Sequence, residues 1–497
     1  MRLTRWALAI LGLASIGIAV TASAQALQRT DEIRPPLAPH ARSAKQGRAE
    51  AAAVAGAGWI TWGNGLERQS RATTTDLFAR AVGSLKKAWS RPVDDIVNAQ
   101  PLYLRNIAIR GARRDIYIVA TENGSVYAFD ARTGKKLWRR SVGRDTKVCP
   151  GWTPPDGDFG VTSTPMYDAI RKQLYVAVST RLLALDVKTG NPRPGWPVQF
   201  AFNPLKEHVF GAVAQLGRYA YVATASACND SRPFKGRLFR VDVEARDVKE
   251  WDPVTVTDPL NGGGGMWGWG GVAVAPSSGH VWALTGNAES DIDSKDEGLG
   301  DAESVVELDP ELVRLHADKP GGVPRSGDYD FGATPLLFEP RGCPPLVAGN
   351  NKVGKTYLWR RSSLEDGPYQ RIKVSQPPAF FGTPAWDPVR QQLYVTTTGE
   401  IPKGGLVALR KSDDCTFSVR WRVPLGGFLN SVPTVSNDVV FVGVADGSLR
   451  AFSARTGDEL WRGKVGSKPL FASPIVVGRD VAIAGWDRRL TVYRLPR

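Results

Sequence analysis

One phrase of this chain occurs twice, near opposite ends. Residues 128–138 read Ala-Phe-Asp-Ala-Arg-Thr-Gly-Lys-Lys-Leu-Trp, and residues 451–461 read Ala-Phe-Ser-Ala-Arg-Thr-Gly-Asp-Glu-Leu-Trp. A weaker copy of the first half lies at 184–190. A phrase that returns across so long a chain predicts a repeat array rather than a string of unrelated domains.

The phrase predicts a strand, a turn and a returning strand. Apolar residues alternate between two faces at 126–129, which is typical of a strand. The Asp-x-x-Thr-Gly segment then favours a turn, in which Gly134 accepts a positive φ. The second strand ends in Trp138, which is large enough to pack one sheet against the next.

The repeat divides the chain into units of four strands, designated A to D from the inside outward. The last unit has only three strands, and residues 87–91 near the start look like its missing strand D, with Trp89. Closing a ring in this way protects the sheet edges. We therefore predict an all-β fold, an eight-bladed β-propeller with four-stranded antiparallel blades, whose last blade is closed by an N-terminal strand. The units are 98–140, 159–200, 208–254, 266–318, 330–374, 380–425, 430–465 and 471–495.

The first 57 residues differ from the rest. Residues 1–24 have a basic start, a short apolar run and a small-residue cleavage pattern, which indicate a signal peptide; an uncleaved anchor helix is the alternative. Residues 25–57 indicate a flexible leader, and 58–497 form the propeller. We expect a periplasmic or secreted protein with no transmembrane segment after signal removal. The formal net charge of +15 is scattered, so no nucleic-acid partner is expected.

Four cysteines in an exported chain favour disulfides. Cys149 and Cys228 fall in loops of one propeller face, whereas Cys343 and Cys415 fall in loops of the other. The face-compatible pairs are therefore 149–228 and 343–415, with four separate thiols as the alternative. The four histidines are isolated, and no Cys-x-x-Cys-His motif indicates covalent haem.

The repeated phrase resembles that of quinoprotein-type β-propellers, which are named for pyrroloquinoline quinone (PQQ). The resemblance covers about residues 58–497 and is fairly specific for the eight-bladed fold. It does not by itself imply cofactor binding, because the same blades occur in scaffold proteins without enzymatic activity.

A Gly-rich segment at 262–269 carries the first site motif. It resembles the segment of PQQ alcohol dehydrogenases that supplies a tryptophan beneath the quinone. That resemblance makes Trp267 the platform and Trp269 the alternative. It also makes Asn287, in a Gly-Asn pair after the next strand, a metal ligand. Each residue has an ordinary alternative as well, a core tryptophan or a turn asparagine.

Two further motifs resemble those dehydrogenases. By resemblance, Asp328 is the catalytic base and a metal ligand, and Asp330 is an additional ligand associated with lanthanides. Lys352 corresponds to the basic residue that binds the quinone carbonyls. Asn287 and Lys352 fall in B–C loops and Asp328 in a D–A loop, so all three are expected on one face.

The chain also departs from the dehydrogenase pattern. The loop at 226–231 lacks the glutamate that ligates the metal, and Asp230 is its only charged substitute. The adjacent-cysteine disulfide of many such enzymes is absent; the first B–C loop is 121–124 instead. The pattern is closer to a divergent branch, like polyvinyl alcohol dehydrogenases without their haem domain.

The resemblance implies a periplasmic quinoprotein-like oxidoreductase. It would oxidise a small or polymeric alcohol with PQQ and Ca²⁺ or a lanthanide, and pass electrons to an external acceptor. The alternatives are a non-catalytic scaffold that binds protein or polymer in the cell envelope, and a degenerate propeller that retains its site residues without turnover.

Overall fold

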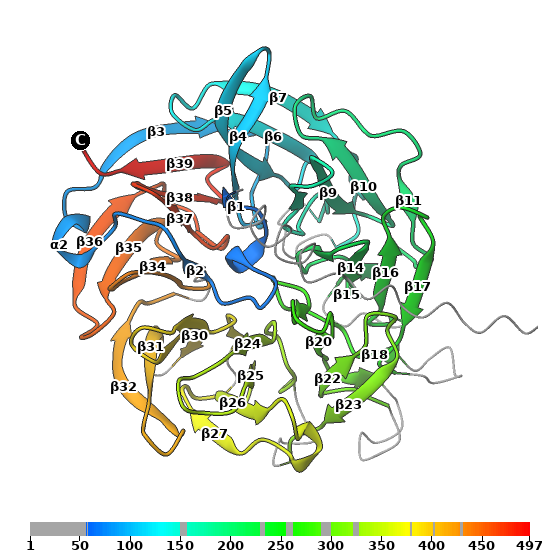
Figure 1. Cartoon of the computed structure of the whole chain (residues 1–497), viewed down its shortest axis with the longest axis vertical. Helices are drawn as coiled ribbons and strands as arrows, with labels where there is room; N and C mark the ends of the chain where they lie inside the picture. The colour runs from blue at the N-terminus through cyan, green and yellow to red at the C-terminus, as the bar shows by residue number, and fades with distance from the viewer. Residues whose placement is uncertain are drawn as a thin grey trace, which may run out of the picture. The chain divides into compact units, whose positions relative to one another are not determined.

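The protein is an eight-bladed β-propeller, seen here in a computed structural model (Figure 1). The structure describes residue 56 and residues 58–497, except 150–156, 229–233, 255–261, 290–299, 322–327, 378–379, 401–402 and 428–430. The predicted signal peptide and leader lie outside the described residues, apart from Gly56. Among the described residues, no helix is long and apolar enough to cross a membrane.

The first four blades follow the predicted units. Their strands, from inside outward, are β4 (Leu102–Ile109), β5 (Ala112–Ala120), β6 (Ser125–Asp130) and β7 (Lys136–Ser141); β8 (Met166–Asp168), β9 (Gln173–Val178), β10 (Arg181–Asp186) and β11 (Val198–Gln199); β13 (Ala214–Leu216), β14 (Tyr219–Ala223), β16 (Leu238–Asp242) and β17 (Val248–Trp251); and β19 (Ala273–Val274), β20 (Val281–Leu284), β22 (Val305–Leu308) and β23 (Arg314–Asp318).

The second four blades also follow the prediction. Their strands, in the same order, are β24 (Leu336–Phe338), β25 (Leu346–Asn351), β26 (Lys355–Arg360) and β27 (Gln370–Lys373); β29 (Ala385–Asp387), β30 (Gln392–Glu400), β31 (Lys403–Lys411) and β32 (Phe417–Pro424); β33 (Thr434–Ser436), β34 (Val439–Gly443), β35 (Ser448–Ser453) and β36 (Glu459–Lys464); and β37 (Ile475–Val477), β38 (Asp480–Gly485), β39 (Arg489–Arg494) and β3 (Lys86–Pro92).

Strand β3 closes the ring, as predicted. It pairs antiparallel with β39, and Trp89 lies opposite Val492. The outermost strand of the last blade therefore comes from the start of the propeller, and the pairing of chain segments more than 390 residues apart holds the ring shut.

The repeated phrase connects each blade to its neighbour. The indole of Trp89 in blade 8 donates a hydrogen bond to the carbonyl of Ala131 in blade 1, at 3.1 Å. A Cβ at Gly134, which has φ of +69°, would lie 2.7 Å from a ring carbon of Trp89. The turn thus requires glycine twice, for its backbone conformation and for the approaching indole. The same contact recurs between Trp138 and Gly190, and between Trp421 and Gly457.

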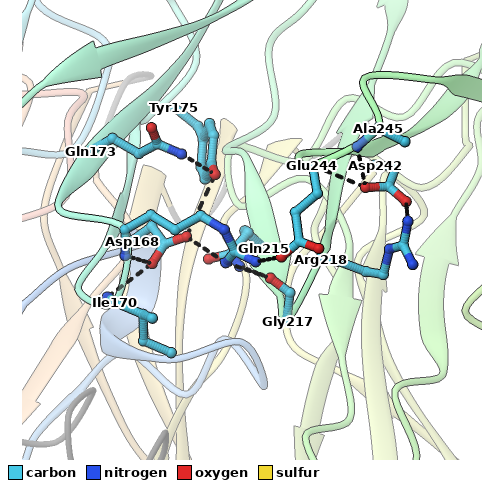
Figure 2. A network of polar contacts seen from close by, with 11 residues as sticks. Asp168, Ile170, Gln173, Tyr175, Gln215, Gly217, Arg218, Asp242, Glu244 and Ala245 are labelled. Atoms are coloured by element: carbon cyan, nitrogen blue, oxygen red, sulfur yellow. Dashed lines mark hydrogen bonds and ion pairs between the residues drawn. The ribbon is translucent and has the colours of Figure 1, made fainter. Parts of the chain in front are cut away.

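An Asp-x-x-Arg motif in the A–B turn of one blade connects that turn to the next blade (Figure 2). Asp168 in blade 2 accepts a hydrogen bond from Arg171 at 3.0 Å, and Arg171 also donates to the carbonyl of Gly217 in blade 3. Arg171 pairs as well with Glu244 of blade 3. Asp387 and Arg390 form an equivalent connection from blade 6 to Asn437 of blade 7.

The N-terminal part of the propeller runs through the centre of the ring, which the repeat did not predict (Figure 1). We define residues 58–78 as the axial segment; its carbonyls at Leu66, Glu67, Gln69 and Ser70 accept hydrogen bonds from inner strands of blades 4, 5, 6 and 7. Its elements and those that follow or flank the blades are β1 (Gly58–Trp59), η1 (Trp62–Asn64), β2 (Arg71–Ala72), α2 (Ala79–Val82), β12 (Glu207–His208), β15 (Ala225–Ser226), β18 (Gly262–Gly263), β21 (Ala288–Glu289), η2 (Leu364–Asp366) and β28 (Phe380–Phe381).

Both predicted disulfides are present. Cys149 is bonded to Cys228, with their Cα atoms 5.4 Å apart, and Cys343 to Cys415, at 5.8 Å. Each bond joins loops on one face of the ring, which confirms the assignment of loops to faces.

Candidate functional site

Four polar residues predicted for the site meet on the B–C and D–A face. Asn287 follows β20, and Lys352 follows β25, both in B–C loops. Asp328 and Asp330 lie between β23 and β24, in the D–A loop that joins blade 4 to blade 5. Two neighbouring blades therefore supply the whole cluster, which we call the Lys352 cluster.

The Lys352 ammonium lies between the two carboxylates. Its Nζ is 2.5 Å from Asp328 Oδ1 and 2.7 Å from Asp330 Oδ1. Asn287 contacts the same carboxylates from the other blade: its side-chain amide donates to Asp328 Oδ1 at 3.2 Å, and its backbone N–H donates to Asp330 Oδ2 at 3.1 Å. Asp328 and Asp330 are two residues apart in their loop, and both carboxylates contact the same ammonium.

The two carboxylates differ in burial. Asp330 is 2% exposed and Lys352 is 6% exposed, whereas the side chain of Asp328 is 47% exposed. Burial raises the pKa of Asp330, and the Lys352 ammonium opposes that shift. Burial alone would lower the pKa of Lys352, but Asp330 and Asp328 outweigh it and the pKa is raised, so this lysine stays charged.

Glycines bring the tryptophan-bearing segment against this cluster. The backbone N–H of Gly286 donates to the carbonyl of Gly265 at 2.8 Å, and β18 pairs with β21 just beyond. A Cβ at Gly286 would lie 2.5 Å from Asp330 Oδ2 and 3.0 Å from Trp267 Nε1. Only glycine therefore allows the carboxylate and the indole to lie beside the same backbone.

The two candidate tryptophans have different surroundings. Trp267 lies beside Gly286 and packs on Phe210, with ring centroids 5.4 Å apart. Trp269 packs edge-to-face on Phe471 at 4.7 Å and belongs to the apolar cluster around Trp62 of the axial segment. Of the two, Trp267 is the one next to the Lys352 cluster.

A second buried polar cluster lies on the same face, and the sequence analysis did not assign it a role. Glu122, in the first B–C loop, accepts hydrogen bonds from Asn98 at 2.8 Å and from the Thr162 hydroxyl at 2.9 Å. His208 Nε2 is within hydrogen-bond distance of the same hydroxyl, at 2.8 Å. Burial raises the pKa of Glu122 to about 7 and lowers the pKa of His208 to about 3.

Aromatic rings connect this second cluster to Trp267. His208 lies against Phe210 with ring centroids 4.9 Å apart, and Phe210 contacts Trp267. The sequence contains one hint of this second cluster, the charged Glu122 in the short loop 121–124. Its partners come from three blades and share no motif.

The donor set has the chemistry of a site for a hard cation. Carboxylate and amide oxygens are the ligands preferred by Ca²⁺ and similar ions. Within the described part of the chain, no three His, Cys, Asp or Glu side chains form a metal-binding group, and Asp230 lies outside that part. The Lys352 ammonium forms ion pairs with both carboxylates and offsets one of their two negative charges.

Two family models match separate parts of the ring. The PQQ model, described as the β-propeller domain of glucose, ethanol and alcohol dehydrogenases, matches residues 59–222. The related model, described as outer membrane protein assembly factor BamB, matches residues 350–495. Together they match the first and the last part of the chain that forms the eight-bladed ring. This chain belongs to the PQQ-type β-propeller repeat family.

Relatives of this PQQ-type propeller include dehydrogenases. A polyvinylalcohol dehydrogenase of a Pseudomonas species is 24% identical over 465 residues, which cover 83% of this chain and 68% of that protein. Among solved structures, the quinohemoprotein alcohol dehydrogenase of Comamonas testosteroni has a TM-score of 0.70 at 17% identity, covering 90% of this chain and 84% of that one. A europium-containing methanol dehydrogenase has a TM-score of 0.70 at 14% identity, covering 90% and 100%. The structural likeness concerns the fold.

Proposed function

We propose that this PQQ-type propeller is a periplasmic oxidoreductase that oxidises an alcohol with PQQ and Ca²⁺ or a lanthanide. The observation that carries the proposal is the Lys352 cluster, in which an amide, two carboxylates and an ammonium from two blades lie beside Trp267. The alcohol dehydrogenases among its relatives support the substrate class.

The residues present fit such a cofactor and metal. Asn287, Asp328 and Asp330 offer the oxygen donors that Ca²⁺ or a trivalent lanthanide prefers. Gly286 keeps the backbone free of a side chain where Trp267 and Asp330 approach it, and Trp267 offers an aromatic surface for a planar ring. Lys352 is a charged donor suited to a quinone carbonyl.

The roles of the chain's own residues follow from their burial. Asp328 is half-exposed, so a substrate hydroxyl can reach its carboxylate, which would accept the hydroxyl proton as general base. Lys352 and Asn287 hold Oδ1 of Asp328 from two sides and so orient the carboxylate. Asp330 is inaccessible to substrate and would serve the metal. Bound PQQ would supply the hydride acceptor.

The substrate class is inferred from a similar protein, and the kind of electron acceptor from the sequence. We infer a primary or secondary alcohol, either small or carried on a polymer, since a polyvinylalcohol dehydrogenase is similar along most of this chain. The sequence has no Cys-x-x-Cys-His motif, so we expect reducing equivalents to leave to a separate acceptor.

A second candidate is a scaffold that binds protein or polymer in the cell envelope. The match of residues 350–495 to the BamB model favours it, because that stretch includes Lys352, two complete blades and three of the four strands of blade 8. In that case the Lys352–Asp330 pair would only stabilise the loops. The two candidates differ in one measurable property, which is affinity for PQQ.

The experiment is a titration of purified protein with PQQ in the presence of Ca²⁺ or La³⁺, followed by a dye-linked alcohol oxidation assay. Tight binding by the wild type, with turnover lost in Asp328→Asn and retained in the exposed control Asp413→Asn, supports the proposal. Absence of PQQ binding with either metal would exclude the enzyme and favour the scaffold. Full turnover of Asp328→Asn would reject Asp328 as the base.

A further inference from the structure

A cleft of about 780 Å³ lies between blade 8 and blade 1, where the ring closes. It is lined by the β4–β5 hairpin, the turn after β6, the turn between β37 and β38, and the end of β39. Those turns join strand A to B and strand C to D. The cleft therefore lies on the face opposite the Lys352 cluster, whose residues occupy B–C and D–A loops.

One wall of the cleft is an extension that the other blades lack. The inner strand β4 has eight residues, whereas the inner strands of the other seven blades have two or three. A bulge between Leu104 and Ile107 bends β4, and Asp115 holds it by accepting from the backbone N–H of Asn106 and from the hydroxyl of Tyr103, both at 2.8 Å. The hairpin thus projects a fixed surface beside blade 8.

The lining carries an excess of positive charge. Seven of its side chains are arginines and three are aspartates, and none is a lysine. Arg494 forms two hydrogen bonds of 2.6 Å to Asp480, and Arg114 pairs with Asp130 at 3.0 Å. Asp115 accepts its hydrogen bonds from within the β4–β5 hairpin. All three acidic groups therefore already have partners.

Four of the other five arginines form no ion pair within the part of the chain that the structure describes. Among the described residues, no carboxylate forms an ion pair with Arg105, Arg113, Arg132 or Arg479. Arg105 and Arg113 make only long contacts, to Thr74 at 3.5 Å and to a carbonyl at 3.4 Å. The Nε of Arg479 is buried and has no hydrogen-bond acceptor. Arginine side chains from both blades thus converge on one cleft, and four of them form no ion pair with a described carboxylate.

We propose that this cleft binds a ligand with two or more phosphate groups. A guanidinium presents a planar pair of N–H groups that matches phosphate oxygens, and a lining whose cationic side chains are all arginines suits such bidentate recognition. The cleft volume is in the range of small-molecule sites. The phosphates can belong to a soluble ligand or to an acidic phospholipid headgroup.

The first test is calorimetric titration of the full chain with inorganic tripolyphosphate at low and high salt. The double variant Arg105→Gln/Arg113→Gln should bind about tenfold more weakly, since charge-assisted hydrogen bonds are removed. The matched control Arg420→Gln/Arg455→Gln removes the same charge from exposed positions in blades 6 and 7 and should change affinity less than about twofold. Equal losses in both variants, or no saturable binding by the wild type, would overturn the proposal.

A conservative substitution distinguishes recognition by the planar N–H pair of a guanidinium from attraction by charge alone. Arg479→Lys keeps the charge and loses the planar donor pair, so its affinity should fall while its melting temperature stays near that of the wild type. Unchanged affinity in this variant would overturn bidentate recognition at Arg479.

A binding experiment with lipid vesicles identifies the source of the phosphate. Binding to phosphatidylglycerol vesicles but not phosphatidylcholine vesicles, with displacement by tripolyphosphate and loss in the Arg105→Gln/Arg113→Gln variant, would identify a lipid headgroup. Tripolyphosphate binding without vesicle binding would identify a soluble ligand. Both results support the site. Vesicle binding that the double variant retains would show that the cleft is not the contact.

Discussion

The ammonium nitrogen of Lys352 lies 2.7 Å from Oδ1 of Asp330, and both side chains are withdrawn from water. The backbone reinforces the pair, because the N–H of Lys352 donates to the carbonyl of Asp330 at 2.9 Å. The buried Asp330 carboxylate thus depends on the Lys352 ammonium for its compensation, whereas Lys352 also pairs with the half-exposed Asp328.

Removing the lysine should therefore cost more than removing an ordinary surface charge. Lys352→Ala leaves Asp330 buried without its cation, and we expect a loss of about 3–5 kcal/mol in the free energy of unfolding at pH 7. The loss should shrink at pH 5, because Asp330, whose pKa would rise further, can then take up a proton. Urea denaturation at both pH values measures the difference. Lys355→Ala, three residues on, is the control, and a deficit in Lys352→Ala that does not depend on pH would contradict this account.

The contact between blades makes a prediction about Gly134. Gly134→Ala places a methyl group 2.7 Å from the Trp89 ring at a positive φ, whereas Gly111→Ala has a similar φ of +77° and no atom within 4 Å. Both variants should carry a backbone cost of about 1–2 kcal/mol, and Gly134→Ala about 1–3 kcal/mol more. Guanidinium denaturation of the two variants gives that difference. Equal losses would mean that the Trp89 contact does not constrain position 134.

Glu122 should make stability fall as pH rises. Its pKa is about 7 in the folded protein against an ordinary value of 4.5, so the folded state binds its proton more tightly. The stabilising contribution is complete below pH 4.5 and is lost as pH rises through about 7. Glu122→Gln is neutral throughout, so its stability relative to wild type should increase across this window, by on the order of 3 kcal/mol. Thermal unfolding from pH 4.5 to 8 tests this, and the exposed control Glu339→Gln should show no such trend.

Each disulfide should contribute to stability by an amount that grows with the logarithm of the loop it closes. Cys343 and Cys415 are 72 residues apart, and a loop of that size corresponds to roughly 4 kcal/mol in the chain-entropy account. The Cys343→Ser/Cys415→Ser variant should unfold at correspondingly lower denaturant. Peptide mapping without reduction should recover 343 with 415 and 149 with 228. Any other pairing would conflict with the arrangement of loops on the two faces.

Local patterns in the sequence were sufficient to predict the architecture. The repeated phrase predicted the eight blades, the strand containing Trp89 predicted the closure, and the loop assignments predicted both cysteine pairs. These features depend on the alternation of side chains along single strands and on turn glycines, which act over a few residues. Such short-range preferences can be predicted from the local order of the residues.

Other features were decided only by the packing of blades around the axis. The repeat did not indicate that residues 58–78 would run through the centre of the ring, or that Glu122 would find partners at Asn98, Thr162 and His208. The sequence left Trp267 and Trp269 as alternatives, and only the fold brought Trp267 beside Gly286; its role beneath a quinone stays a prediction. The arginine cleft likewise joins residues near 105 to residues near 479. The physical reason is that burial, charge compensation and ring stacking are set by which loops meet in space, and here those loops are tens to hundreds of residues apart.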